Sequence, residues 1–563
     1  MKSDSASRLM QRQREASRKQ RRGMALVVVL VLSMLLALAA YNYTYRMESQ
    51  YRSTSVFEEQ AQARAVALSG IEFASSILEL PHSSRESLLS DPKLFHRVTL
   101  EQFSGEAPDE EQQQFRGAAA PWRFSLVVPA QGSSNDLGRS ANEAAPNTFS
   151  FGLQSESAKL HLPTLLEWDS LFPGHAQATL MRLPGATPEL VDALLKEMGA
   201  SPANSQVPGI GQSTRQPPER NIGSKLQRAW VGDDWDQNYH VDVLEQEIAR
   251  SRFEAADSSQ TWSDSGAGFA LDQTQQAVGW QHVLTWHSGQ RNVTAEGKDR
   301  IDLNSANLPE LHSALVQIWP TEWANFVVAY RQYGPTSTSS SSSGAANSRI
   351  WLPDMSVVAS TELKSPLELV DATVSVPNPS GGGSRSLSSK TITLQSPFSS
   401  AAGPNSDYLE RLLDEVTTTS SGTIVGRVDV SEAKPWVLGS VPGISGDTVN
   451  RIIEAREDDP SVKQAATVGW LVEKGIVGLD TLKELEPFLT NRSDVFSTQA
   501  VGYRDGKSAV FRMTVILDGL EGTIRWRMPQ TWHEWGSGFS ISKWDSSVRF
   551  AAETDSSRNR KDG

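Results

Sequence analysis

The sequence predicts an α+β fold in which a long N-terminal transmembrane helix packs on an antiparallel sheet, and a large, mostly α-helical insertion interrupts that sheet. Three observations predict this fold. An apolar run near the N-terminus continues into a helically patterned segment, strand-like alternation occurs both early and late in the chain, and helix-hairpin-helix-like motifs lie between. A sheet whose strands lie on both sides of a long middle section requires that section to be an insertion.

The 563-residue chain is acidic, with 53 Lys and Arg against 66 Asp and Glu and a formal net charge of -13. Residues 1–23 hold eight basic and two acidic side chains, a balance of +6, which leaves about -13 - 6 = -19 for the remainder. A body this acidic repels phosphate backbones, so we expect no nucleic-acid partner. The chain has no cysteine, which excludes disulfides, thiolate metal sites and cysteine nucleophiles.

The strongest signal is an uncharged apolar run at residues 24–40, followed by Tyr41, Tyr43 and Tyr45. As a helix this run is long enough to cross a bilayer core of about 30 Å, with the tyrosines at one interface. The basic residues before it favour a cytoplasmic location for that end, which places the rest of the chain on the other side of the membrane.

Helical patterning continues at residues 48–80, where one face carries Ala67, Ile71, Ala74 and Leu78 at spacings of three and four. Strand-like alternation predicts the sheet at residues 122–128, 148–153, 495–503, 509–517 and 523–528. Asp505-Gly506, between two of these segments, is typical of a hairpin turn.

Three segments share a helix-hairpin-helix-like pattern, at residues 181–198, 301–332 and 441–456. In the first and third, a Pro-Gly pair sets a tight turn before a helix with apolar positions at helical spacing. These pairs are Pro184-Gly185 and Pro442-Gly443. A short extended segment precedes each of the three copies.

Such hairpins often bind DNA, through backbone amides that a second glycine exposes to a phosphate. Here Thr187 and Ser445 stand at the position of that second glycine. Glu189 and Asp447 follow two residues later, where a phosphate would need a cation. We therefore expect packing modules of a protein-interaction domain, and DNA binding is the alternative.

An acidic segment has oxygen-bearing residues at the ligand spacing of an EF-hand loop, which binds Ca²⁺. Its ligands would be Asp234, Asp236, Asn238, Asp242 and Glu245, with His240 contributing its backbone carbonyl. Tyr239 replaces the usual glycine and disfavours the positive φ that the turn needs. A calcium site and an acidic, solvated surface turn both remain open interpretations.

No pattern in the sequence predicts an active site. The nine histidines lack a metal-binding spacing, and no nucleophile elbow or phosphate-binding glycine loop occurs. His282 and His287 are five residues apart, which favours a strand or surface location over a shared metal. The histidines are His82, His96, His161, His175, His240, His282, His287, His312 and His533.

The N-terminal pattern resembles a type IV prepilin leader, in which a basic leader ends in Gly and is cut on the cytoplasmic side, leaving the apolar run on the mature protein. Here the sequence is Arg21-Arg22-Gly23-Met24, so the cut falls after Gly23. A secretory signal peptide would end in a small-residue cleavage site and a break, which the continuing helical pattern lacks. A plain signal anchor accounts for the apolar run but not for the glycine at its border.

In proteins with such leaders the fifth mature residue is normally Glu, which pairs with the free amine of a neighbouring subunit, whereas here it is Val28. Lacking this Glu is characteristic of one family, general secretion pathway protein K, the large minor pseudopilin of type II secretion. Residues 323–331, residues 426–502 and the order of the hairpin motifs are also similar to that family. A buried carboxylate without a partner amine costs several kcal/mol, so its absence suits a terminal subunit.

The resemblance implies a single-pass, non-enzymatic protein of the inner membrane, with a short cytoplasmic N-terminus and a periplasmic body. It implies a position at the tip of the pseudopilus, where the subunit initiates assembly for protein export across the outer membrane. The implied partners are the other minor pseudopilins, the major pseudopilin, prepilin peptidase and the inner-membrane secretion platform. Calcium sites are known among pseudopilins of this type. The alternatives are a membrane-anchored DNA receptor and a tip protein of a type IV pilus.

These expectations divide the chain into eight parts. The first four are a prepilin leader at 1–23, a transmembrane segment at 24–45, a pilin-like helix with the first strands at 46–153 and a helical insertion at 154–335. The last four are low-complexity linkers and short elements at 336–405, a third hairpin module at 406–490, the last pilin-like strands at 491–540 and a disordered tail at 541–563. Within the fifth part, the small, polar residues at 336–348 and, at its centre, 378–386 predict flexible linkers.

Overall fold

The computed structural model describes the backbone of residues 4–89, 91–99, 121–129, 149–183, 185–199, 226, 229–230, 279–336, 345–346, 351–378, 391–400, 408–504 and 510–527. In the first helix, side chains are described from Val27 onward.

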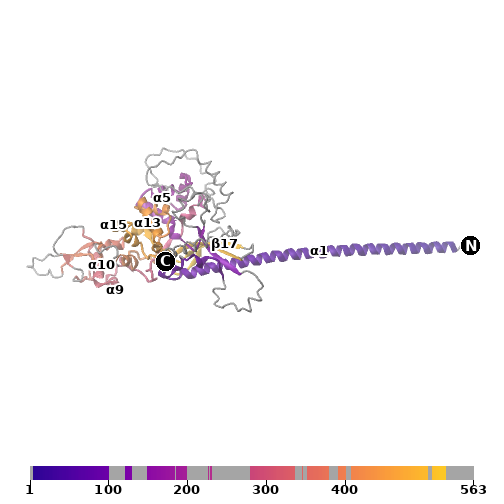
Figure 1. The fold of residues 1–563 in the computed structure, drawn as a ribbon, viewed down its shortest axis with the longest axis horizontal. Helices are drawn as coiled ribbons and strands as arrows, with labels where there is room; N and C mark the ends of the chain where they lie inside the picture. Colours follow the sequence, from indigo (N-terminus) through magenta and orange to yellow (C-terminus); the bar gives the residue numbers. More distant parts are fainter. Residues whose placement is uncertain are drawn as a thin grey trace, which may run out of the picture.

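A single helix, α1 (Asp4–Leu78), projects from a broad head and carries the N-terminus far from it (Figure 1). Between Val27 and Phe57 all of its large apolar side chains are exposed. Further along, the face predicted from the spacing of Ala67, Ile71, Ala74 and Leu78 is confirmed, because all four side chains are buried. The same helix therefore has a solvent-exposed apolar half and a half that packs on the head.

In the described residues, α1 packs on an antiparallel sheet of seven strands. Five strands follow the order β1 (Val98–Thr99), β2 (Trp122–Pro129), β16 (Val495–Arg504), β17 (Val510–Asp518) and β18 (Arg525–Arg527). In addition, β3 (Phe149–Phe151) pairs with β2, and β4 (Gln154–Ser155) pairs with β16. The five strands predicted from alternation are confirmed as β2, β3, β16, β17 and β18. The predicted turn at Asp505-Gly506 lies outside the described residues.

The middle of this sheet joins distant parts of the chain. Strand β2 pairs directly with β16, with Val127 opposite Gln499. Because α1 contacts β2, β16 and β17, the helix holds the early and late strands in one layer. The pairing of β2 with β16 therefore requires the intervening chain to return β16 to β2.

Helix and sheet approach each other at backbone distance. A Cβ added to Gly502 would lie 2.0 Å from the carbonyl oxygen of Ala63 and 2.7 Å from the amide nitrogen of Ala67. On the helix, a Cβ added to Gly70 would lie 2.7 Å from the ring of Phe124. Real Cβ atoms essentially never approach other atoms within 3.0 Å, so at Gly502 the backbone itself would have to shift. Glycine at these two positions sets the distance between α1 and the sheet.

Between β4 and β16 the described residues form three helical units, each opened and closed by two-residue strands that pair in parallel. The pairs are β5 (Leu160–His161) with β6 (Leu284–Thr285), β8 (Ile301–Asp302) with β12 (Val416–Thr417), and β14 (Val428–Asp429) with β15 (Leu489–Thr490). Each pair has the same register, with an apolar residue opposite an apolar residue and then a threonine opposite His161, Asp302 or Asp429. The extended segments predicted before the hairpins are thus confirmed as the opening strands.

The turns beside these strands repeat as well. After each closing strand, the N–H two residues on donates to the threonine Oγ1: His287 to Thr285 at 3.0 Å, Thr419 to Thr417 at 3.3 Å and Arg492 to Thr490 at 3.1 Å. After the second and third opening strands, the aspartate Oδ1 accepts in the same way, from Asn304 at 2.8 Å and from Ser431 at 2.9 Å. These short side chains end each strand by giving the backbone a turn partner.

Among the described residues, the first unit includes the helices α4 (Leu162–Leu171), α5 (His175–Leu180) and α6 (Pro188–Glu197), and the second includes α9 (Leu308–Ile318), α10 (Thr321–Tyr333) and α11 (Tyr408–Asp414). The third unit holds α12 (Pro435–Leu438), α13 (Gly446–Asp458), α14 (Trp470–Glu473) and α15 (Leu479–Leu485). A further helix, α2 (His82–Leu89), follows α1, and strands β7 (Gly289–Arg291) and β13 (Thr423–Val425) pair beside the units. One continuous apolar core runs through the three units, and a separate one lies between α1 and the sheet.

The second unit also contains a small sheet of β10 (Thr373–Pro377), β11 (Thr391–Gln395) and β9 (Ala345–Ala346). Strand β9, which pairs in parallel with β11, lies within residues 336–348, for which the sequence predicts a flexible linker. Composition missed β9 because its pairing with β11 uses backbone groups and requires no large side chain.

We predict that Gly502→Ala lowers the free energy of unfolding by about 2–3 kcal/mol or more, because the added methyl forces α1 away from β16. Hydrogen exchange of the β16 and β17 amides in the detergent-solubilised full chain measures this change. Gly422→Ala is the matched control, since a Cβ there meets no atom within 4 Å. Equal protection in the two variants would contradict the close approach.

Candidate functional site

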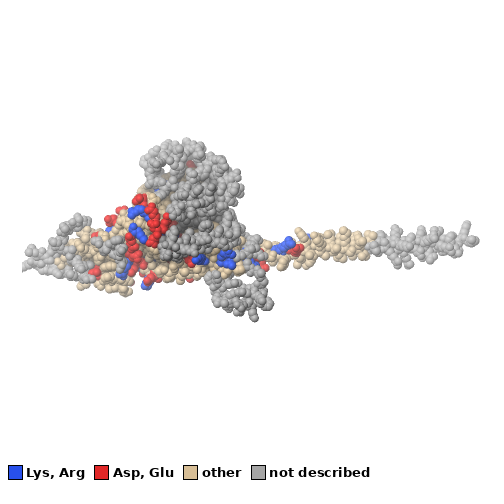
Figure 2. Space-filling view, viewed as in Figure 1, with Lys and Arg blue, Asp and Glu red and all other residues tan. Residues whose placement is uncertain are grey.

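The first candidate functional element is the exposed half of α1, which we call the stem (residues 27–57). In the described part of the chain, one helix is long and apolar enough to span a membrane, and the stem supplies its apolar window. Figure 2 shows Lys, Arg, Asp and Glu gathered over the head, whereas the outer part of the described stem carries none. A surface of this composition is stable when lipid or other apolar helices cover it.

The predicted processing residues lie in the same helix. Gly23 and Met24 fall inside α1, before the stem, and Val28 lies at its start with 64% of its surface exposed. No acidic residue follows until Glu48. The stem is therefore apolar and uncharged throughout the segment that would enter a bilayer.

The hairpin motifs form turns between helices in the first and third units. Gly185 (φ +64°) and Gly443 (φ +84°) both have the left-handed backbone that glycine permits, and Pro184 lies outside the described residues. The structure adds a hairpin that the sequence reasoning missed, between α14 and α15 at Gly475 (φ +66°). Its signal was the sequence Gly475-Ile-Val-Gly478, where two glycines separate two short apolar helices.

Thr187 and Ser445, which stand where a DNA-binding hairpin has its second glycine, cap helices. The Thr187 hydroxyl accepts from the Leu190 N–H at 3.4 Å, and the Ser445 hydroxyl accepts from the Thr448 N–H at 3.2 Å. Each hydroxyl thereby occupies one of the helix N-terminal N–H groups that a phosphate would otherwise bind. This arrangement suits helix packing.

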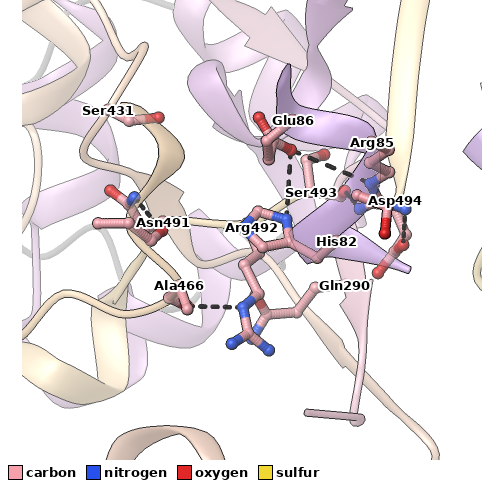
Figure 3. Close-up of polar contacts among 12 residues, drawn as sticks. His82, Arg85, Glu86, Gln290, Ser431, Ala466, Asn491, Arg492, Ser493 and Asp494 are labelled. Atoms are coloured by element: carbon pink, nitrogen blue, oxygen red, sulfur yellow. Dashed lines mark hydrogen bonds and ion pairs between the residues drawn. The ribbon is translucent and has the colours of Figure 1, made fainter. Parts of the chain in front are cut away.

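The second candidate element is the joint between α2, the helical units and the sheet, which is built around Asp494 (Figure 3). Arg85 on α2 is 2% exposed and pairs through Nη1 with Asp494 Oδ1 at 2.8 Å, while its Nη2 donates to the Ser493 carbonyl at 2.5 Å. The Arg291 N–H donates to Asp494 Oδ2 at 2.6 Å. Burial alone would raise the pKa of Asp494, but the charges of Arg85 and Arg291 and the Arg291 N–H bring it below its ordinary value.

Next to Asp494, Arg492 connects the units to each other. Its Nε donates to the Ala466 carbonyl at 2.6 Å, its Nη1 to the Val293 carbonyl at 3.0 Å, and its Nη2 pairs with Asp414. These partners belong to the third unit, to the segment after β7 and to α11. One buried guanidinium therefore fixes three segments, and Figure 3 shows its bond to the Ala466 carbonyl. Sequence reasoning missed Arg85 and Arg492 because, without its partners, a buried arginine has no local signature.

A group of carboxylates lies near Glu86 of α2. Asp429 and Glu432 follow one another at the start of the third unit, and Glu86 on α2 is close enough to influence both. Burial, followed by the negative charge of Asp429, raises the pKa of Glu432 to about 7, against the opposing charge of Lys463 and the Ser155 N–H. Burial also raises the pKa of Asp429, whose Oδ1 accepts from both the N–H and the hydroxyl of Ser431.

The predicted calcium loop, Asp234 to Glu245, lies outside the described residues and stays a prediction. Within the described ranges, no group of three or more His, Asp or Glu side chains is arranged to hold a metal ion. His282 ends a short 3-10 helix, and His287 follows β6. Burial lowers the pKa of both, so they are neutral at pH 7.

We predict that Arg85→Met costs about 3–5 kcal/mol of stability, because it leaves the Asp494 carboxylate buried without its main partner. Arg525→Met removes an exposed arginine whose Nη1 lies 2.9 Å from Glu521, and it should cost at most about 1 kcal/mol. Urea unfolding of the detergent-solubilised full chain compares the two variants. Similar costs would show that the Asp494 joint does not stabilise the head.

The raised pKa of Glu432 makes stability depend on pH. The folded state binds this proton more tightly than the unfolded chain, so the stabilisation is fully present below about pH 4.5 and is lost as pH rises to about 7. We expect a loss on the order of 1–3 kcal/mol across this window. Subtracting the pH profile of Glu432→Gln from that of the wild type isolates the effect. Glu473→Gln, at an exposed position, is the control and should leave the slope unchanged.

Comparison with known proteins gave no relative on which to base a function. A scan against protein-family models, a search of curated proteins and a search of solved structures each found no match.

Proposed function

We propose that the protein is the large minor pseudopilin of a type II secretion system, a non-enzymatic subunit of the general secretion pathway protein K family that caps the pseudopilus. One observation carries the proposal: the exposed apolar stem and the segment buried against the sheet belong to one unbroken helix. A subunit of a helical filament needs this combination, because its stem packs beside the stems of its neighbours while its head stays outside the bundle.

The leader pattern supports the proposal. Cleavage after Gly23 would make Met24 the first mature residue and leave the complete stem on the protein. Val28, at the position that normally carries Glu, contributes no carboxylate that a neighbour's amine would have to neutralise. The mature stem would associate laterally with those of two smaller minor pseudopilins and so seed the filament.

The extent of the head supports a terminal position. In Figure 1 the helical units lie over and beyond the inner end of α1, with α9 and α10 on the side of the head opposite the N-terminus. A subunit stacked above would have to occupy the space that these units fill. The filament can therefore accommodate the chain where nothing lies above it.

The charge distribution supports an orientation. The eight basic side chains before the stem favour a cytoplasmic N-terminus, with the head in the periplasm and the stem in the inner membrane. In this arrangement the prepilin peptidase and the inner-membrane secretion platform meet the stem end. The other pseudopilins meet the stem and the sheet side of the head.

Site-specific crosslinking tests the tip position, because the chain has no cysteine and one introduced cysteine is its sole thiol. Tyr51→Cys on the stem and Leu352→Cys beyond α10 form a matched pair, since each native side chain is 77% exposed. After labelling with benzophenone maleimide in cells that assemble the filament, Tyr51→Cys should give adducts with the smaller pseudopilins. Leu352→Cys should give none with the major pseudopilin.

Adducts between position 352 and the major pseudopilin would contradict the tip position. Mass spectrometry of the same preparations should find N-methylated Met24 as the first residue, whereas retention of residues 1–23 would exclude the pseudopilin class. Salt-sensitive binding of duplex DNA by the full chain would instead favour a DNA receptor. Adducts with pilins of a type IV system would reassign the chain to that filament.

A further inference from the structure

A cavity of about 270 Å³ opens where the second and third units meet. Its wall includes the end of the second unit, the whole of β13 and the start of the segment that closes the third unit. The charged side chains on the wall are Arg300, Arg427 and Glu486, and the hydroxyl groups include those of Thr417, Thr419 and Thr423. Neither the stem nor the Asp494 joint contributes to this wall.

Arg300 is a buried cation with little compensation. Its side chain is 7% exposed, and its ion pair among the described residues is a long one, 3.9 Å from Nη2 to Asp414 Oδ1. Asp414 Oδ1 is already shared, because it pairs with Arg492 and accepts from the Ala295 N–H at 2.9 Å. The Nε of Arg300 has no hydrogen-bond partner in the described part of the chain.

Among the described residues, the charged side chains around Arg300 have an excess of one positive charge. Arg427 pairs with Glu486 Oε1 at 2.9 Å, and Arg492 pairs with Asp414. Three guanidinium groups therefore face two carboxylates. Burial, followed by the charge of Arg492, lowers the pKa of Arg300 to about 9, which still leaves it protonated at pH 7. One additional carboxylate would balance the site.

The shape of the wall favours a peptide as the source of that carboxylate. Successive residues of a strand point to opposite faces, yet Thr423, Ile424 and Val425 all line the cavity, so the cavity reaches the edge of β13. On its other edge β13 pairs with β7, and in the described residues these two strands form a sheet by themselves. An extended peptide can add to such an edge through backbone hydrogen bonds.

We propose that this cavity is a binding site for a peptide carboxylate, with Arg300 as the main cationic contact and β13 as the edge along which the peptide backbone lies. The carboxylate is supplied either by a peptide C-terminus or by an Asp or Glu side chain. The site is independent of the proposed filament role, because it requires only the contact between the second and third units.

Calorimetric titration of the detergent-solubilised full chain with three probes tests the site. N-acetyl-trialanine with a free carboxylate presents a C-terminus, its carboxamide removes the charge, and N-acetyl-Ala-Asp-Ala-amide presents a side-chain carboxylate. At least one of the two acids should bind about 10- to 100-fold more tightly than the carboxamide, the range expected for charge-assisted hydrogen bonds. Whichever acid binds more tightly identifies the source.

Val425→Glu and Val425→Gln supply a matched pair, because Val425 lines the cavity, is 48% exposed and tolerates either side chain without loss of core packing. Val425→Glu should weaken binding of the preferred acid at least tenfold relative to Val425→Gln, since its carboxylate repels the ligand. Arg300→Gln should abolish the preference for acid over amide. Equal affinity for acid and carboxamide, no saturable binding of either acid, or equal binding by the two Val425 variants would overturn the proposal.

Discussion

The buried carboxylate of Asp494 is the constraint on which the arrangement of the head depends. Its oxygens bind Arg85 of α2 and the N–H of Arg291, its own N–H donates to the Gly289 carbonyl at 2.9 Å, and its carbonyl accepts from the Gly519 N–H at 2.8 Å. Through these four hydrogen bonds, one residue connects α2, the helical units and the sheet. A buried charge is tolerated only when all of its partners are in place, so the joint favours one relative position of these parts.

Local periodicity predicted the parts of the fold that one segment determines by itself. The apolar face of α1 and the five long or edge strands follow from spacings of three to four and of two residues. Pairing across the chain leaves no such pattern: the closing strands at Leu284, Val416 and Leu489 are two residues long, too short for alternation to appear. In the sequence, Gly502 is only a glycine that weakens a strand. Its role in the close approach of α1 to β16 is evident only from the structure.

The candidate functional residues also divide into those that a local sequence pattern predicts and those whose role depends on distant partners. The stem and its basic border are continuous in sequence, so the expected span at 24–45 lies within α1, and its large apolar side chains from Val27 onward are exposed. The glycines of the first and third hairpins lie in turns, because a Pro-Gly pair encodes its own backbone conformation. Arg85, Asp494 and Arg300 were not predictable, because their roles arise from partners that folding brings together from far along the chain. The residues of the expected calcium loop stay a prediction from ligand spacing alone.

The three parallel strand pairs have a consequence for the length of the head. Each pair brings the entry and the exit of its unit side by side, so a residue inserted inside one unit changes that unit and leaves the next one starting from the same place. Lengthening a closed loop costs only about 0.6 kcal/mol for each doubling of its length. The head can therefore vary in bulk, unit by unit, while the stem and the sheet keep a constant geometry, which makes its size a property that can change without altering how the chain is anchored.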